Sequence, residues 1–225
     1  MNTKLIIHIV ISLISLSGLI VYYYAFLLGY KKHKKKKKKQ SKLPEKLYFM
    51  STYPALIWYV LPFIEQPRMH GIYDWLNGEF VFFNVLYIPV SFLLFVYFFG
   101  IWGKKSVSQN IEATKSAFYA PSKLLTEGIY ARVQHPMIIG DILGHFSLVL
   151  LTGGIYTCIL FPIYVFIDLF MIKIQVKYSL EPYYKSELIV YRKKTPVLLD
   201  QKLLFIVLFM ALLVICNFLN YTKII

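Results

Sequence analysis

Residues 137–172 read MIIGDILGHFSLVLLTGGIYTCILFPIYVFIDLFMI, and they form two apolar runs separated only by Thr152, Gly153 and Gly154. Three residues of this kind can do little except reverse the chain between two helices. A helix needs about 20 mainly apolar residues to cross the hydrocarbon layer of a bilayer, and the second run comes close to that length. The stretch therefore predicts a helical hairpin inside a membrane.

Further apolar runs lie on both sides of this hairpin. The runs that approach or exceed membrane-spanning length are Leu5–Tyr30, Leu47–Ile64, Phe80–Ile101 and Ile155–Ile172. Two shorter runs are counted with them, Met137–Leu151 and Leu203–Leu219. The sequence thus predicts an all-α integral membrane bundle of about six transmembrane helices, with kinks at its internal prolines.

The runs divide the chain into three regions. Residues 1–123 carry the first helices and a lysine-rich loop, residues 124–199 carry the hairpin with its polar flanks, and residues 200–225 carry a final helix. The first run is longer than the apolar core of a signal peptide and lysines follow it, so we expect it to be retained.

The composition favours a lipid environment. Of the 225 residues, 58% are hydrophobic and the mean hydropathy is +0.58, whereas soluble domains are nearer half apolar. The net charge of +14 lies in blocks between apolar runs rather than along one polar face, which argues against nucleic acid as a partner. Cys158 and Cys216 both lie in apolar runs, so neither a disulfide framework nor a cysteine-based zinc site is expected.

The basic residues predict the orientation in the membrane. Residues 31–46, 102–136 and 173–202 together hold 22 of the 25 lysines and arginines. Because cytoplasmic loops carry an excess of Lys and Arg, we expect these three segments in the cytoplasm and both termini on the other side. The tract Lys31–Lys39 has two interpretations, a signal for this orientation or a contact for anionic lipid headgroups.

Two polar segments flank the hairpin. Residues 124–141 read LLTEGIYARVQHPMIIGD, and residues 177–199 read KYSLEPYYKSELIVYRKKTPVLL. Since the open ends of a hairpin lie side by side, we expect His135 and Glu181 to be close in space. Convergence of this kind is typical of a binding site.

These segments resemble the isoprenylcysteine carboxyl methyltransferase and phospholipid methyltransferase superfamily. The residues similar to its signature G-x-Y-x-x-x-R-H-P-x-Y-x-G are Gly128, Tyr130, Arg132, His135, Pro136 and Gly140. The residues similar to its second segment are Glu181, Tyr184, Tyr191 and Pro196. The resemblance implies a membrane enzyme that transfers methyl groups from S-adenosylmethionine to a lipid or lipidated acceptor, either a prenylcysteine carboxylate or a phospholipid amine. Its implied cofactor-binding residues are Tyr130, Arg132, His135, Pro136, Glu181, Tyr184 and Tyr191.

Three positions depart from the pattern, namely Gln134, Ile138 and Leu180, which stand where the family has Arg, Tyr and Glu. Arg132 is the candidate to replace the missing cation. S-adenosylmethionine carries a carboxylate, an ammonium, a sulfonium and an adenine, so its site requires cations, a carboxylate and aromatic walls. The motif residues supply these groups. Methyl transfer depends on positioning and on exclusion of water, so it requires no covalent nucleophile.

Asp141 and His145 are the candidate catalytic residues. They are four residues apart and so share one face of a helix, where ionisable groups are costly and usually functional. Either one could take a proton from an ammonium acceptor. The alternative is a mutually satisfied polar pair. No metal site is expected, because His135 and His145 are rotated off a common face.

Structural interpretations exist for the other candidates as well. His135 before Pro136 is typical of a helix start, Glu181 could pair with Lys177 at i, i+4, and tyrosines such as Tyr130 often anchor a membrane boundary.

Two other functions compete with methyl transfer. Gly140–Asp141 after His-Pro also resembles a segment of NADPH-dependent sterol reductases, although no glycine-rich dinucleotide motif is present. A non-catalytic membrane protein that retains the fold is the other alternative. In each case we expect a multi-pass protein with cytoplasmic motif loops, in the endoplasmic reticulum of a eukaryote or otherwise in the inner or plasma membrane.

Overall fold

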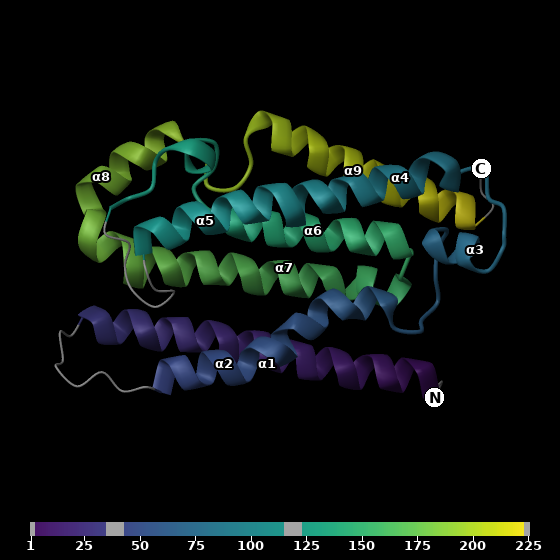
Figure 1. Cartoon of the computed structure of the whole chain (residues 1–225), viewed down its shortest axis with the longest axis horizontal. Coiled ribbons are helices and arrows are strands. Elements are labelled where there is room, and N and C mark those ends of the chain that lie inside the picture. The colour runs from purple at the N-terminus through teal and green to yellow at the C-terminus, as the bar shows by residue number, and fades with distance from the viewer. Residues whose placement is uncertain (1–2, 35–42, 115–122, 223–225) are drawn as a thin grey trace.

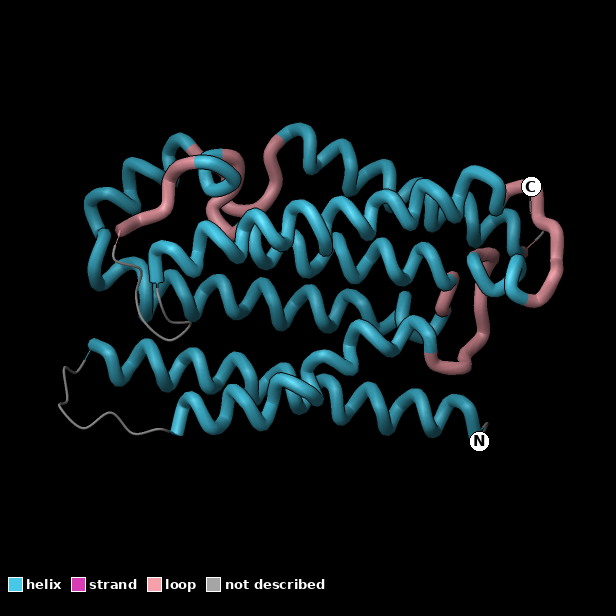
Figure 2. Tube along the Cα trace, viewed as in Figure 1, coloured by secondary structure: helices cyan, strands magenta, loops and turns pink. Residues whose placement is uncertain are grey.

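The computed structural model describes residues 3–34, 43–114 and 123–222, and within these ranges it is helical without any strand. Most helices run roughly along the long axis of one elongated bundle (Figure 1). Most loops lie toward the two ends of that bundle, and the connection from α8 to α9 reaches inward along its side (Figure 2). The predicted all-α class is therefore confirmed.

Four helical stretches are long and apolar enough to cross a membrane, which makes the chain a multi-pass membrane protein. They are Thr3–Lys31 within α1 (Thr3–Lys34), Asn84–Ala113, Ile155–Lys194 and α9 (Gln201–Tyr221). The second comprises α4 (Asn84–Phe95), a π-helical turn at Val96–Trp102 and α5 (Gly103–Thr114). The third comprises α7 (Ile155–Gln175), a π-helical turn at Val176–Leu180 and α8 (Glu181–Lys194).

Two of these helices are longer than predicted. The expected ends at Ile101 and Ile172 are wrong, because each helix continues past the apolar run into α5 or α8. Charged residues mark where a helix leaves the hydrocarbon, but they do not stop the helix itself. The expected start at Phe80 is also too early, since the helix begins at Asn84.

Two further helices, α2 (Leu43–Val60) and α6 (Pro136–Thr152), belong to the same bundle but are not among those four. The interval expected to span at 47–64 is helical only to Val60 and then tightens into a 3₁₀ turn at Leu61–Phe63. Glu45 and Lys46 lie in the first turn of α2 and lower its apolar content. A short helix α3 (Ile72–Leu76) and a 3₁₀ turn at Gly128–Ala131 complete the fold.

Helix α6 lies in the middle of the bundle, and 13 of its 17 residues are buried. It approaches the π-helical turn before α5 closely at Gly140, where a Cβ atom would lie 2.9 Å from Cδ1 of Trp102. Gly153 then adopts the left-handed conformation, with φ of 66°, and ends α6 two residues before α7 begins. Left-handed backbone of this kind favours glycine.

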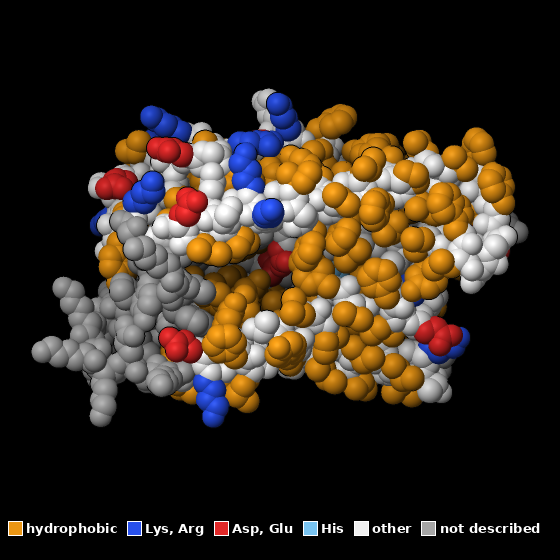
Figure 3. All heavy atoms as spheres, in the orientation of Figure 1, with side chains coloured by type: hydrophobic (Ala, Val, Ile, Leu, Met, Phe, Trp, Pro, Cys, Tyr) orange, Lys and Arg blue, Asp and Glu red, His pale blue; other side chains and the backbone are white. Residues whose placement is uncertain are grey.

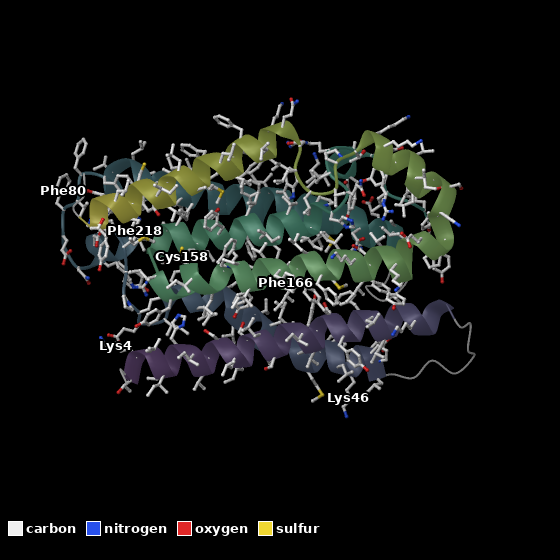
Figure 4. All side chains as sticks on the ribbon, turned by 180° about the vertical axis from the view of Figure 1, so that it is seen from behind. Lys4, Lys46, Phe80, Cys158, Phe166 and Phe218 are labelled. Carbon is white, nitrogen blue, oxygen red and sulfur yellow. The ribbon has the colours of Figure 1, made fainter. Side chains whose placement is uncertain are left out.

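The outer surface is largely apolar. Phe80, Phe166 and Phe218, which are labelled in Figure 4, are all exposed, as are many other large hydrophobic side chains on the long helices. In a soluble protein such a surface would cause aggregation, whereas lipid chains cover it without cost.

The two ends of the bundle differ in charge. Both termini lie at one end and α8 at the other (Figure 1). On the face shown in Figure 3, most basic side chains gather toward the α8 end. Lys4 and Lys46 lie toward opposite ends of the α1–α2 pair (Figure 4).

Candidate active-site cavity

A cavity of about 790 Å³ lies between the α1–α2 pair and helices α5, α6, α7 and α8. Figure 3 shows a hollow in the side of the bundle that is walled mainly by hydrophobic side chains, with an acidic group at its inner end. Cavities that bind small molecules usually measure about 300 to 1,000 Å³. The volume is therefore sufficient for a cofactor together with part of a second substrate.

Both motif segments reach this cavity. The predicted site residues that line it are Tyr130, His135, Pro136, Asp141 and Tyr191. The predicted site residues that do not line it are Arg132, His145, Glu181 and Tyr184. The two π-helical turns also contribute, through Phe98 and Ser179 among others. Such turns are rare and frequently occur at functional sites.

Three hydrogen bonds join the segments at the cavity wall. The Tyr191 hydroxyl donates to the Tyr130 carbonyl oxygen at 2.5 Å. The Gln134 side-chain amide donates to the Thr195 carbonyl oxygen at 2.6 Å, and its backbone N–H donates to that of Pro196 at 3.0 Å. Gln134 therefore bridges two stretches of backbone at the position where the family has arginine.

His135 is the most enclosed polar group of the first segment. Its ring Nδ1 lies 3.1 Å from Oε1 of Gln175, and the residue is only 5% exposed. Burial lowers the pKa of His135 to about 4, because the opposing effect of Gln175 is weaker and Arg192 adds to the decrease. The neutral ring must donate from Nδ1 to the amide oxygen, which leaves Nε2 as a hydrogen-bond acceptor.

Glu181 lies outside the cavity. Its carboxylate is exposed and accepts a hydrogen bond from Arg192 at 3.5 Å, so the alternative pairing with Lys177 is wrong. Residues 176–180 form a π-helical turn, which places neighbours five rather than four residues apart and so removes the i, i+4 register. The polar partner of His135 is Gln175 instead. Tyr184, half-buried at the kink of α8, also lies away from the cavity.

Arg132 is not positioned as the missing cation. Its guanidinium forms a salt bridge with Asp200 at 2.7 Å. Asp200 in turn accepts the Leu203 N–H and caps α9. Partial burial raises the pKa of Asp200, but these hydrogen bonds lower it by more, so the net shift is downward. Among the described residues, the basic side chain at the cavity wall is Lys104 of α5.

Asp141 is the acidic side chain at the cavity wall in the described part of the chain. It lies about one and a half turns into α6, and the Tyr59 hydroxyl donates a hydrogen bond to its carboxylate. Lys104 lies two residues after Trp102, whose indole N–H donates to the Pro136 carbonyl at 2.7 Å. The cation is therefore level with the start of α6, and the carboxylate is deeper in the bundle.

His145 has a different environment from Asp141, although both lie on α6. Its ring stacks on Trp58 at 3.7 Å between centroids, and Phe161 lies parallel to it at 5.8 Å. Neither ring nitrogen has a hydrogen-bond partner among the described residues. The alternative of a mutually satisfied Asp141–His145 pair is therefore wrong, because Tyr59 donates to the carboxylate and aromatic rings enclose the imidazole.

Three residues near the cavity were not selected from the sequence. Asp168 of α7 is buried and accepts a hydrogen bond from Tyr23, and an acidic residue in an apolar span is itself a signal for function. Gln175 and Lys104 carry no such signal, because many polar and basic residues surround them in the sequence.

The described residues contain no group of three His, Cys, Asp or Glu side chains that could hold a metal ion. Comparisons of the chain with protein-family models, with curated proteins and with solved structures find no match.

Proposed function

We propose that this chain is a membrane methyltransferase that binds S-adenosylmethionine in the 790 Å³ cavity and methylates a lipid or lipidated acceptor. The observation that carries the proposal is the convergence of the two motif segments. Tyr130, Asp141, Tyr191 and residues 134–138 line one cavity, and Lys104 lines it as well. This combination supplies a place for a charged cofactor and for an acceptor group beside it.

We further propose six spans, formed by the four long helices together with α2 and α6. The α8 end then faces the cytoplasm, because Lys46 (Figure 4) and the basic last turn of α8 lie toward it. The termini face the opposite side. The membrane is the endoplasmic reticulum in a eukaryote and the plasma or inner membrane otherwise.

The polar residues of the wall fit the cofactor. Lys104 is positioned to meet the carboxylate of its methionine part. The side-chain oxygen of Gln134 and the acceptor Nε2 of His135 can bind donors such as an amino group, and aromatic residues including Tyr130 and Tyr191 provide flat surfaces. When bound, S-adenosylmethionine supplies a methyl group on a positively charged sulfur that leaves as a neutral thioether.

The acceptor enters from the lipid. The hollow opens in the side of the bundle (Figure 3), so a lipid headgroup can enter while its chains stay in the bilayer. A carboxylate acceptor is already nucleophilic and needs no base. An ammonium acceptor must lose one proton, and Asp141 at the inner end is placed to receive it.

Binding of the two candidate cofactors to the purified full-length chain in detergent tests the proposal. Calorimetry should detect S-adenosylmethionine but not NADPH. Lys104→Gln should weaken this binding roughly ten- to a hundredfold, because a charged hydrogen bond is worth about 1.5 to 3 kcal/mol. Lys105→Gln is the matched control, since Lys105 is exposed and does not line the cavity.

A second variant restores the family residue. Gln134→Arg should tighten binding of S-adenosylmethionine if the enzyme is active but divergent. Failure of both the natural chain and this variant to bind would favour the non-catalytic alternative, and binding of NADPH instead would favour the reductase.

A further inference from the structure

Two tyrosine–aspartate hydrogen bonds cross the inner end of the cavity. The Tyr23 hydroxyl of α1 donates to Asp168 of α7, and the Tyr59 hydroxyl of α2 donates to Asp141 of α6. Both tyrosines line the cavity. Both bonds also join the α1–α2 pair to the α6–α7 pair, so each tyrosine hydroxyl is held in a defined direction.

Asp168 is the least accessible member of this group. It is 1% exposed and does not line the cavity, and its Oδ2 has no hydrogen-bond partner among the described residues. Neither Asp168 nor Asp141 forms an ion pair with a described lysine or arginine. An uncompensated aspartate inside a span is costly, which indicates a role beyond packing.

These two hydrogen bonds determine which polar groups of the cavity wall remain available to a ligand. A tyrosine hydroxyl carries one proton and two lone pairs. Because Tyr23 and Tyr59 give their protons to the carboxylates, their oxygens offer only lone pairs to the cavity. Tyr22 and Tyr48, which also line the cavity, engage each other through a side-chain hydrogen bond. The inner end is therefore rich in acceptors and poor in donors.

We propose that Asp168 is a specificity-determining residue of the acceptor site. By holding the Tyr23 proton, it makes the inner end favour a group with several N–H donors, a primary alkylammonium or amine, over a carboxylate. Asp168 acts through Tyr23 and is a positioning residue. Its importance for catalysis rests on the proposed function, whereas the binding preference does not.

The test measures binding of two simple probes to the full chain in neutral detergent, without any methyl donor. Dodecylammonium and dodecanoate carry the same chain with opposite headgroups, and both are charged at pH 7. The natural chain should bind the ammonium at least about tenfold more tightly. Equal affinity for the two probes, or a preference for dodecanoate, would overturn the proposal.

Substitutions then separate hydrogen bonding from charge. Asp168→Leu frees the Tyr23 proton and should reduce the preference roughly tenfold, while Asp168→Asn keeps an acceptor oxygen and should largely retain it. An unchanged preference in Asp168→Leu, or the same loss in both variants, contradicts the role assigned to Asp168.

Tyr23→Phe provides a check that does not depend on the folding of Asp168→Leu. It removes the hydroxyl oxygen from the wall and should weaken ammonium binding without improving dodecanoate binding. Unchanged ammonium binding in this variant contradicts the proposal. Absence of S-adenosylmethionine binding with an intact ammonium preference would instead remove the methyltransferase assignment and leave the acceptor-rich site standing.

Discussion

The two motif segments, residues 124–141 and 177–199, are similarly rich in polar side chains, but they meet the cavity in different ways. The first is enclosed, and Tyr130, His135 and Asp141 all reach the wall. The second turns its charged residues outward, and it lines the cavity only through Ser179, Leu180, Leu188 and Tyr191. A motif resemblance thus locates a region, but burial separates the residues that can bind from those that cover the surface.

The largest difference between the segments should appear in acid. The folded-state pKa of His135 is about 4, below its ordinary value of 6.5. Between these pH values the unfolded chain binds a proton that the folded chain does not. The contribution of His135 to the free energy of unfolding is therefore fully present above pH 6.5. It is lost as the pH falls toward 4, by about 3 kcal/mol in total.

Unfolding in detergent at pH 7 and pH 4.5 measures this loss. His135→Gln lacks the titrating ring and should lose correspondingly less stability on acidification than the natural chain. Equal pH dependence of the two proteins would show that His135 is not enclosed in the way described.

An intermediate effect is expected for the inward face of the second segment. Tyr191→Phe removes the hydrogen bond to the Tyr130 carbonyl and leaves a buried acceptor without that donor. The free energy of unfolding should fall by about 1 to 2 kcal/mol. Tyr53→Phe, at an exposed position of α2, is the control and should change stability by less than about 0.5 kcal/mol. A loss of the same size in both variants would show that the buried hydrogen bond of Tyr191 contributes no more to stability than the exposed hydroxyl of Tyr53.

The smallest effect is expected for the outward face. Glu181→Gln breaks an exposed ion pair with Arg192 at 3.5 Å, and such pairs contribute about 0 to 1 kcal/mol. Binding of S-adenosylmethionine should remain within about twofold of the natural chain by calorimetry. The cofactor role inferred for Glu181 from the motif predicts instead a loss of affinity of about tenfold or more, so the same measurement decides between the two.

Several features of the fold were predictable because they depend on local sequence. Apolar runs predicted the helices α1, α7 and α9, and the Gly153–Gly154 pair marked the reversal after α6. The helix lengths were less predictable. Hydropathy detects where a helix leaves lipid, so the continuation of α7 into α8 through residues 176–180 was missed.

The candidate site was predictable only as a region. Both motif segments were expected to converge, and they do line one cavity. The partner of His135 was not predictable, because the π-helical turn changes the rotation of every residue after Gln175. From the sequence alone, Glu181 was therefore favoured as the neighbour of His135 because of its place in the motif. In the structure, its side chain instead faces outward on α8.

By itself, the sequence determined the helical membrane class of this protein and the location of its polar segments, because apolar length and charge clusters act over a few neighbouring residues. Only the tertiary structure decided that Asp141 faces a cavity while His145, one turn away, is enclosed by Trp58 and Phe161. It likewise placed Asp168 against Tyr23, which is 145 positions away in the chain. Contacts of this kind depend on how whole helices rotate and pack against one another, and no short stretch of residues contains that information.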